Sequence, residues 1–424
     1  MLTFLYTFIN NKVMTTILIS FVGTQDPYSD KNKKNGSILT LTKYLLDQKE
    51  EIKKSILLYT QDLETQAELT KECLQQEFSL LKVELIKVNQ LLSIDPINLS
   101  EAINEAKKGL NTAEKDWQEG DTFAFNASSG TPVMKSSWVI LQSAGYAPYS
   151  NVWQVRNPDT IKTGQDHVFT TNVNSLKQEF DQKIITEQIN NYNYSGALLT
   201  LENSSLLTKK LKDLLIYGKH RLAFNFNLAY SQISNYQEDE IKDFATDITS
   251  LRQNNVCALL KEVYFKACIK LEQKEYSDFL IWLFAFQENL LQYFMRRKFL
   301  AKSQWEKTKW KSVESAIIDK VKIFDQGKLF KTLQNNYVNF SYLNRPMMMD
   351  IINYDNEFSK LLNSVNFIDK YASERNNHIH QLQGVEDIKQ QEKLTKSMSD
   401  ILKLITKLPN SNPFHTLNQT ILNL

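Results

Sequence analysis

The chain has 424 residues, of which 50 are basic and 48 acidic, so its net charge is near +2. This length predicts two or three domains. The near-balance of charge argues against a tight, non-specific nucleic-acid binder, so any RNA contact must come from a local site. Glycine (11) and proline (8) are too scarce for a disordered chain or for an all-β chain full of tight turns.

The first 13 residues, "MLTFLYTFINNKV", are apolar and short, with neither a basic region nor a small-residue cleavage site. We therefore expect residues 1–13 to be a leader or an alternative-start extension that precedes Met14 and lies outside the fold. Because no stretch reaches the roughly 18 apolar residues that a membrane span needs, we expect a cytoplasmic protein without a membrane contact.

The next 160 or so residues alternate short β-rich runs with helical ones. Strand–helix alternation at this spacing makes βαβ units, so we predict a Rossmann-like parallel sheet over residues 14–178. The expected strands are Thr16–Gly23, Ser55–Thr60, Leu81–Val88, Asp121–Ser128, Asn151–Arg156 and His167–Val173, and the expected helices are Leu39–Lys53, Glu64–Ser79, Ser100–Leu110 and Thr131–Gly145.

From about residue 179 to residue 424 the strand signals disappear, and apolar residues recur at i, i+3, i+4 and i+7. The segment Glu275–Phe299 is the clearest helix of this half. The predicted fold class is therefore α/β plus all-α: an N-terminal Rossmann-like domain followed by a helical domain, with no flexible linker between them.

Two loops at predicted strand ends are equipped to bind a ligand, because open parallel sheets bind ligands at the carboxyl ends of their strands. The first is "GTQDPYS" (Gly23–Ser29), and the second is "NASSGTPVM" (Asn126–Met134). In the second loop Thr131 is the expected N-cap and Pro132 the first helical residue, which builds an anion site at a helix N-terminus. An ordinary well-capped helix would use the same residues, and no G-x-G-x-x-G or P-loop motif supports a dinucleotide or P-loop nucleotide.

The stretch "RNNHIH" gathers an arginine and two histidines within six residues of the helical half, although the chain has seven arginines and five histidines. Four residues separate Arg375 from His380, a spacing that chance alone would produce roughly 0.25 times in this chain. A histidine can move the proton of a ribose 2′-OH, and an arginine can hold the phosphate, so the pair suits RNA cleavage without a metal. The alternative is a solvated helix face, and His378 is interpreted as a surface or packing residue.

Metal binding is not expected. The three cysteines (Cys73, Cys257 and Cys268) have no C-x-x-C spacing, and the histidines form no H-E-x-x-H motif.

Taken together, the chain resembles the CARF–HEPN ribonucleases of type III CRISPR systems, Csm-six type. The CARF-like half is carried by "ISFVGTQDPYS" and "NASSGTPVM", and the HEPN-like half by "RNNHIH", which matches an R-x4–6-H motif with a polar residue, Asn376, after the arginine. "NNYNYSGALLTLEN" and "EYSDFLIWLFAFQENLLQYF" also look like the family.

The resemblance implies a homodimer whose CARF domains bind a cyclic oligoadenylate. The type III effector complex makes this activator, so the protein would be functionally linked to that complex without being stably associated with it. The residues implied to line that pocket are Gly23, Thr24, Asp26, Asn126, Ser128, Ser129, Gly130, Thr131 and Met134. Binding would switch on a composite HEPN site in which Arg375, Asn376 and His380 of both subunits cut single-stranded RNA without a metal cofactor. Some CARF domains also cut their activator, and Thr131 and Asn126 are the residues expected to do so here.

Two other functions remain open at this point. One is a nucleotide-sensing interaction protein without nuclease activity, and the other is a constitutive HEPN ribonuclease that needs no ligand. The ring size of the activator and the base preference toward RNA also remain open.

Overall fold

The computed structural model describes residues 15–29, 33–171, 173–301, 310–336, 339–380 and 384–424, and for residues 174 and 372–380 it describes the backbone alone. The chain divides into two compact units, Met1–Phe180 and Asp181–Leu424. The expected leader, residues 1–13, lies outside the described residues. In the described part of the chain no helix is long and apolar enough to span a membrane.

The first unit is built on a six-stranded sheet of order β3-β2-β1-β4-β5-β6. All neighbouring strands run parallel except β5 and β6, which are antiparallel. The predicted Rossmann-like parallel sheet is therefore confirmed, with one antiparallel strand added at its edge. The strands are β1 (Thr15–Phe21), β2 (Glu51–Tyr59), β3 (Lys82–Lys87), β4 (Thr122–Asn126), β5 (Ser150–Val155) and β6 (Val168–Thr170).

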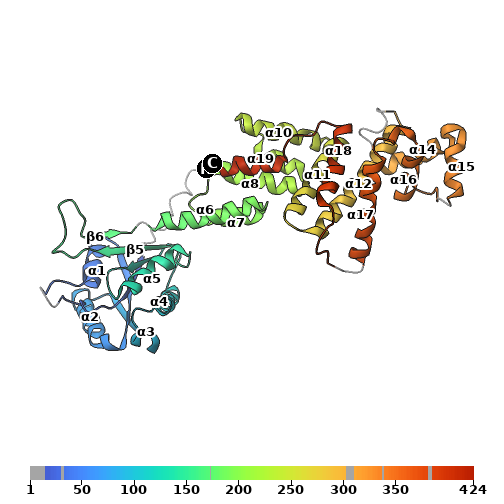
Figure 1. Ribbon diagram of the computed structural model, residues 1–424. Helices are drawn as coiled ribbons and strands as arrows, with labels where there is room; N and C mark the ends of the chain where they lie inside the picture. Colours follow the sequence, from blue (N-terminus) through green and yellow to red (C-terminus); the bar gives the residue numbers. More distant parts are fainter. Residues whose placement is uncertain (1–14, 30–32, 172, 302–309, 337–338, 381–383) are drawn as a thin grey trace, which may run out of the picture. The chain divides into compact units, whose positions relative to one another are not determined.

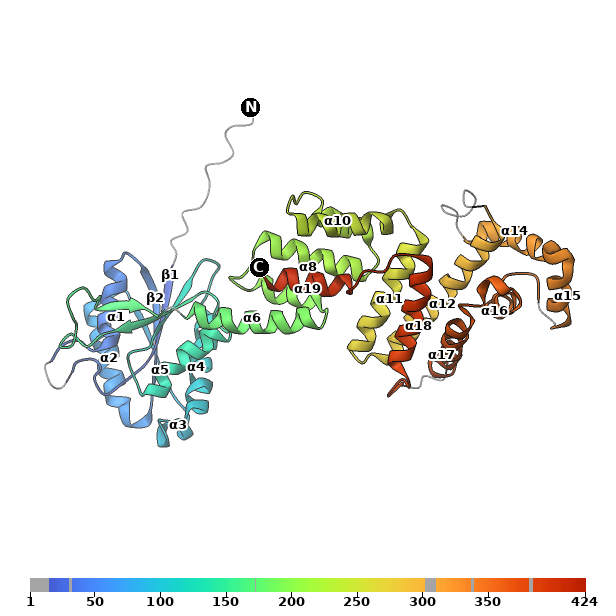
Figure 2. The same cartoon turned by 45° about the horizontal axis from the view of Figure 1, so that its top comes forward.

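Helices cover both faces of this sheet (Figure 2). Because side chains alternate along a strand, Ile17 and Ile19 of β1 pack toward α4 and α5, while Leu18 and Val22 pack toward α1 and α2. The helices of this unit are α1 (Ser37–Asp47), α2 (Glu64–Glu77), α3 (Gln90–Ile94), α4 (Leu99–Glu114) and α5 (Pro132–Ser143), with a short 3-10 segment η1 (Gln61–Leu63), and α6 (Asn174–Asn190) follows the sheet.

The predicted helix Leu39–Lys53 is wrong at its end. Lys49 has a φ of 66°, a left-handed conformation that ends the helix, and strand β2 already begins at Glu51. Pairing of Ile52 with Thr16 of the neighbouring strand β1 extends β2 ahead of Ser55, the predicted start. Short local patterns give no sign of such a partner, which lies 36 residues away.

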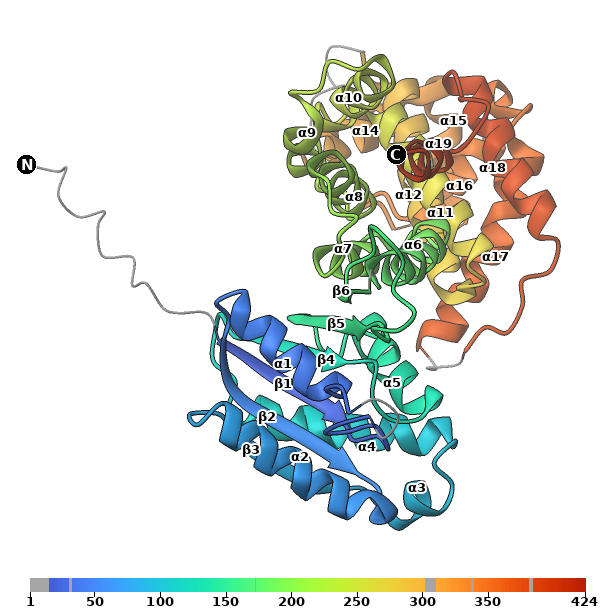
Figure 3. The same ribbon diagram turned by 90° about the vertical axis from the view of Figure 1, so that its left-hand side faces the viewer.

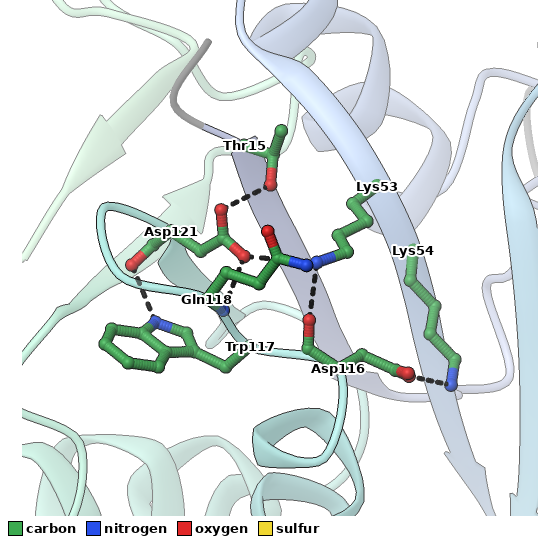
Figure 4. A network of polar contacts seen from close by, with 7 residues as sticks. All are labelled: Thr15, Lys53, Lys54, Asp116, Trp117, Gln118 and Asp121. Carbon is green, nitrogen blue, oxygen red and sulfur yellow. Dashed lines mark hydrogen bonds and ion pairs between the residues drawn. The ribbon is translucent and has the colours of Figure 1, made fainter. Parts of the chain in front are cut away.

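A polar network closes the amino edge of the sheet (Figure 4). Asp121 is 5% exposed and accepts hydrogen bonds from the Thr15 hydroxyl (2.7 Å), the backbone N–H of Gln118 (2.9 Å) and Lys53 Nζ (3.3 Å). Burial alone would raise the pKa of Asp121, but these donors outweigh it and hold the pKa below its usual value. This network joins β1, β2 and the turn before β4 at the edge opposite the predicted ligand loops.

The second unit is helical throughout its described residues, as predicted (Figure 1). Its helices are α7 (Tyr194–Glu202), α8 (Lys209–Leu222), α9 (Phe226–Ile233), α10 (Asp239–Arg252), α11 (Val256–Glu272), α12 (Tyr276–Phe299), α14 (Trp310–Ile323), α15 (Lys328–Asn335), α16 (Arg345–Tyr354), α17 (Leu362–His380), α18 (Gln391–Ile405) and α19 (Pro413–Leu422), with short 3-10 segments η2 (Phe324–Gly327) and η3 (Asn356–Phe358).

Two apolar cores hold this unit together. One surrounds α12, which packs against α11 and α17 (Figure 3). Helix α18 packs against the same two helices. The other gathers α7, α8, α9 and α10 with the C-terminal helix α19, which lies beside α8 although about 200 residues separate the two.

Candidate functional site

The two predicted ligand loops lie side by side. Strands β1 and β4 are neighbours, with Ser20 opposite Asn126, so the loops that follow them leave the sheet at the same edge. The strand order also reverses between β1 and β4. Open α/β sheets bind their ligands in the crevice at such a switch point.

Asp26 holds this edge together. Its carboxylate accepts hydrogen bonds from the Gly23 amide (3.0 Å), from the Ile38 amide in the first turn of α1 (3.4 Å) and from the Ser129 hydroxyl. The side chain is buried, and burial raises the pKa of Asp26 although all three hydrogen bonds oppose that shift. Asp26 therefore joins the first loop, helix α1 and the second loop.

Asn126 is equally engaged in protein contacts. It is fully buried, its amide nitrogen donates to the hydroxyls of Ser20 and Ser37 (both 3.1 Å), and its amide oxygen accepts from the Ser128 backbone (3.0 Å). The Ser128 hydroxyl in turn accepts from the Val155 amide at 2.7 Å. These contacts connect β1, α1, β4 and β5 beneath the loops.

Two glycines allow the loops to approach one another. A Cβ on Gly23 would lie 2.9 Å from both the Gly130 backbone nitrogen and the Ser129 hydroxyl oxygen, closer than real Cβ contacts. Gly130 has a φ of +86°, which side-chain-bearing residues rarely adopt. A larger residue at Gly23 would push the loops apart, and one at Gly130 would strain the turn before α5.

The predicted cap of α5 is confirmed. Thr131 is the N-cap, its hydroxyl accepts from the Met134 amide (3.4 Å) and donates to the Pro96 carbonyl (2.7 Å), and Pro132 is the first helical residue. Met134 is buried beneath this turn.

The nine residues predicted to bind the ligand therefore differ in accessibility. Thr24 is exposed, whereas Ser128, Gly130 and Thr131 are half-buried. Buried are Gly23, Asp26, Asn126, Ser129 and Met134. Lys135, which belongs to none of the predicted motifs, lies half-buried in the first turn of α5, where its positive charge opposes the rise in the pKa of Asp26 that burial causes. A basic residue one turn into a predicted anion-binding helix was the signal that could have identified it.

The second predicted site lies on helix α17. Arg375, Asn376, His378 and His380 all belong to its last turns, and their side chains lie outside what the structure describes. Residues five apart on one helix point about 140° from each other, at roughly 100° per residue.

A half-buried polar cluster joins α17 to α12 and α16. Asp369, six residues before Arg375, accepts from Gln287 of α12 (2.5 Å) and from Arg345 of α16 through Nε (2.9 Å) and Nη2 (2.7 Å). These partners are 82 and 24 residues away, so no local pattern identified them.

Among the residues that the structure describes, no group of three or more His, Cys, Asp and Glu side chains is arranged to hold a metal ion.

Both halves of the chain are similar to known proteins. A family model of the Csm6 HEPN domain matches residues 248–422, which include Arg375 to His380, and a model of the 6H domain of CRISPR-associated protein Csm6 matches residues 171–222. No curated protein matches the chain. Among solved structures, Enterococcus italicus Csm6 bound to cyclic hexa-2'-fluoro-hexa-dAMP is similar at 14% identity and a TM-score of 0.69, over 96% of this chain and 99% of that one.

Proposed function

Because the chain belongs to the Csm6-type family of CARF–HEPN proteins, we propose that it is a type III CRISPR endoribonuclease that a cyclic oligoadenylate switches on. One observation carries the nuclease part: the R-x4-H motif lies on helix α17, within the residues that match the HEPN model. The substrate is single-stranded RNA, and the activator is the functional link to the effector complex.

The proposed chemistry uses the side chains alone. His380 takes the proton from a ribose 2′-OH, and the 2′-oxygen attacks the adjacent phosphate. The bond from phosphorus to the 5′-oxygen breaks as the protonated His380 gives its proton to that oxygen, which leaves a 2′,3′-cyclic phosphate and a 5′-hydroxyl. Arg375 binds the phosphate and stabilises the charge that develops on it, with Asn376 as a further polar contact. Because positions five apart on an ideal helix differ in direction by about 140°, we propose that the complete site combines two copies of α17 across a two-fold axis.

The activator pocket is proposed at the edge where β1 and β4 end. There Thr24, Gly130 and Thr131 are at least partly accessible, and Lys135 adds a positive charge beside them. Asp26, Asn126 and Ser129 would support the pocket from below by holding both loops, because their polar atoms already bond to the protein. We assign ring cleavage to Thr131 rather than to Asn126, because Thr131 is half-buried whereas Asn126 is fully buried.

A homodimer is part of the proposal, since a ring-shaped activator suits a two-fold symmetric pocket. Large apolar side chains are exposed on α3, on the turn after it and at the start of α4: Leu91 (63%), Ile94 (73%), Ile97 (69%) and Leu99 (42%). The same turn contains Pro96, whose carbonyl accepts a hydrogen bond from Thr131. We propose that a second copy covers this patch. Glutamate at Ile94 and Ile97 should shift the mass measured by light scattering from dimer to monomer, whereas Leu80→Glu, at a 95% exposed site before β3, should not.

The deciding experiment is cleavage of a quenched fluorescent single-stranded RNA in EDTA, without ligand, with cyclic tetraadenylate and with cyclic hexaadenylate. Cleavage is expected with one ring and is expected to vanish in Arg375→Ala/His380→Ala, while that variant still binds the ring. His378→Ala is the matched control on the same helix and should cut normally.

The other outcomes separate the alternatives. Cleavage without any ring would indicate a constitutive ribonuclease, and ring binding by a dimer that never cuts RNA would indicate a sensing protein. Chromatography of the ring after each reaction, with Thr131→Ala alongside, tests whether the activator is itself cut.

A further inference from the structure

The helical unit contains a cavity of about 840 Å³ that neither proposed site uses. It lies between α11, α12 and the start of α14, and the turn between α8 and α9 contributes to its wall. Its volume lies in the range of pockets that bind small organic ligands.

Aromatic rings form much of the wall. Phe224 stacks on Trp282 with ring centroids 5.2 Å apart and planes 4° from parallel, and Tyr293 and Trp310 also line the cavity. Phe224 reaches this position with a φ of +59°, a conformation that bulky residues rarely adopt, so tertiary contacts hold its ring against the backbone preference.

The polar lining residues are amides and a guanidinium. Asn254, Asn289 and Gln292 offer both donors and acceptors, and the guanidinium carbon of Arg296 lies 5.5 Å from the ring centroid of Trp310. Behind the wall, Lys266 Nζ lies 3.9 Å from the ring centroid of Trp282. Burial lowers the pKa of Lys266 to about 8, which leaves it charged at neutral pH.

No acidic residue occurs among the described residues that line this cavity. A second cavity of the same unit, of about 460 Å³, differs because Asp247 and Glu262 line it. In the larger cavity, by contrast, a phosphate group would meet no carboxylate of the described lining residues.

We propose that the larger cavity binds a nucleobase of the RNA strand, stacked on its aromatic wall and paired through its edge with the amides. Single-stranded RNA is recognised by this combination of stacking and edge contacts, and guanidinium groups add to the stack. Helix α12 also connects the cavity to the candidate catalytic helix, because Trp282, Asn289 and Arg296 line the cavity while Gln287 bonds to Asp369 of α17. The inference rests on the proposed ribonuclease function for the identity of the strand.

The test uses the full chain and a fluorescent all-2′-deoxy oligonucleotide, which lacks the attacking hydroxyl and cannot be cut. Trp310→Leu and Asn289→Ala should each weaken binding by roughly tenfold, and Trp310→Phe should restore most of it. Two exposed residues of the same unit are matched controls, Tyr342→Leu for the aromatic change and Asn335→Ala for the amide change, and neither should change the affinity.

In the activated nuclease assay the same variants should raise KM for RNA and leave kcat nearly unchanged. Unchanged affinity and KM in both Trp310→Leu and Asn289→Ala would overturn the inference while leaving the ribonuclease intact. A protein that never cuts RNA but loses oligonucleotide binding in these variants would refute the proposed function and keep the cavity as a base site. If AMP or UMP binding alone depends on these residues, the cavity takes free nucleotides and the assignment to an RNA strand is wrong.

Discussion

The Ser129 hydroxyl donates a hydrogen bond to the Asp26 carboxylate, across 103 residues of sequence, and so joins the two loops at the carboxyl edge of the sheet. Both side chains are buried, with 4% and 3% of their surfaces exposed. Ser129→Ala leaves the carboxylate with one donor fewer, and we expect a loss of about 1–3 kcal/mol in the free energy of unfolding. Urea unfolding followed by circular dichroism measures it. Ser136→Ala, which removes an exposed hydroxyl bonded within α5, should change little.

Asp26 should also make stability depend on pH. Because burial raises its pKa above the ordinary value of 3.8, the folded state keeps the proton at pH values where the unfolded state has lost it. The stability from this group is therefore full below pH 3.8 and is lost as the pH rises through the folded-state pKa. The difference in unfolding free energy between the native protein and Asp26→Asn should fall over that range. A difference that grows with pH would show that the pKa is lowered instead.

Gly23→Ala should separate the loops, because the added Cβ would lie 2.9 Å from two atoms of the second loop. We expect lower stability and at least a tenfold weaker response to the ring activator, measured by RNA cleavage against ring concentration. Gly384→Ala is the control, since a Cβ there meets nothing within 4 Å. A normal response in Gly23→Ala would place the activator elsewhere.

The buried pair of Arg221 and Glu262 should dominate the stability of the helical unit. Arg221 donates to both carboxylate oxygens, through Nε at 2.7 Å and Nη2 at 2.9 Å, and each side chain is 3% exposed. Glu262→Gln leaves a buried cation without its counter-charge and should cost about 3–5 kcal/mol in urea unfolding. Arg221→Met/Glu262→Leu should cost less than the single change, whereas loss of the exposed Lys242–Asp239 pair should have no measurable effect.

Asp369 is expected to act as a positioning residue for the catalytic helix. Asp369→Asn weakens the contacts of α17 with Arg345 and Gln287. We expect kcat for RNA to fall several-fold while ring affinity stays constant, since the first unit is untouched. Asp350→Asn, on α16 outside this cluster, serves as the control. Equal kcat in both variants would contradict the role.

The sequence by itself determined the succession of strands and helices, the place of the loops at strand ends, and the cap at Thr131 with Pro132 after it. These features depend on periodicity and on residues one to four positions apart, which a short window contains. It also determined that Arg375 and His380 share one helix.

The tertiary structure alone decided which polar side chains face inward. Asp26 and Asn126 look like ligand contacts in the sequence, yet they bond to Ser129, Ser20 and Ser37, and the partners Ser129 and Ser20 lie more than 100 residues away. The early start of β2, the cluster around Asp369 and the aromatic cavity likewise arise between segments distant in the chain. Local sequence encodes backbone conformation, whereas the burial of a side chain and its hydrogen-bond partners are decided when distant segments pack together.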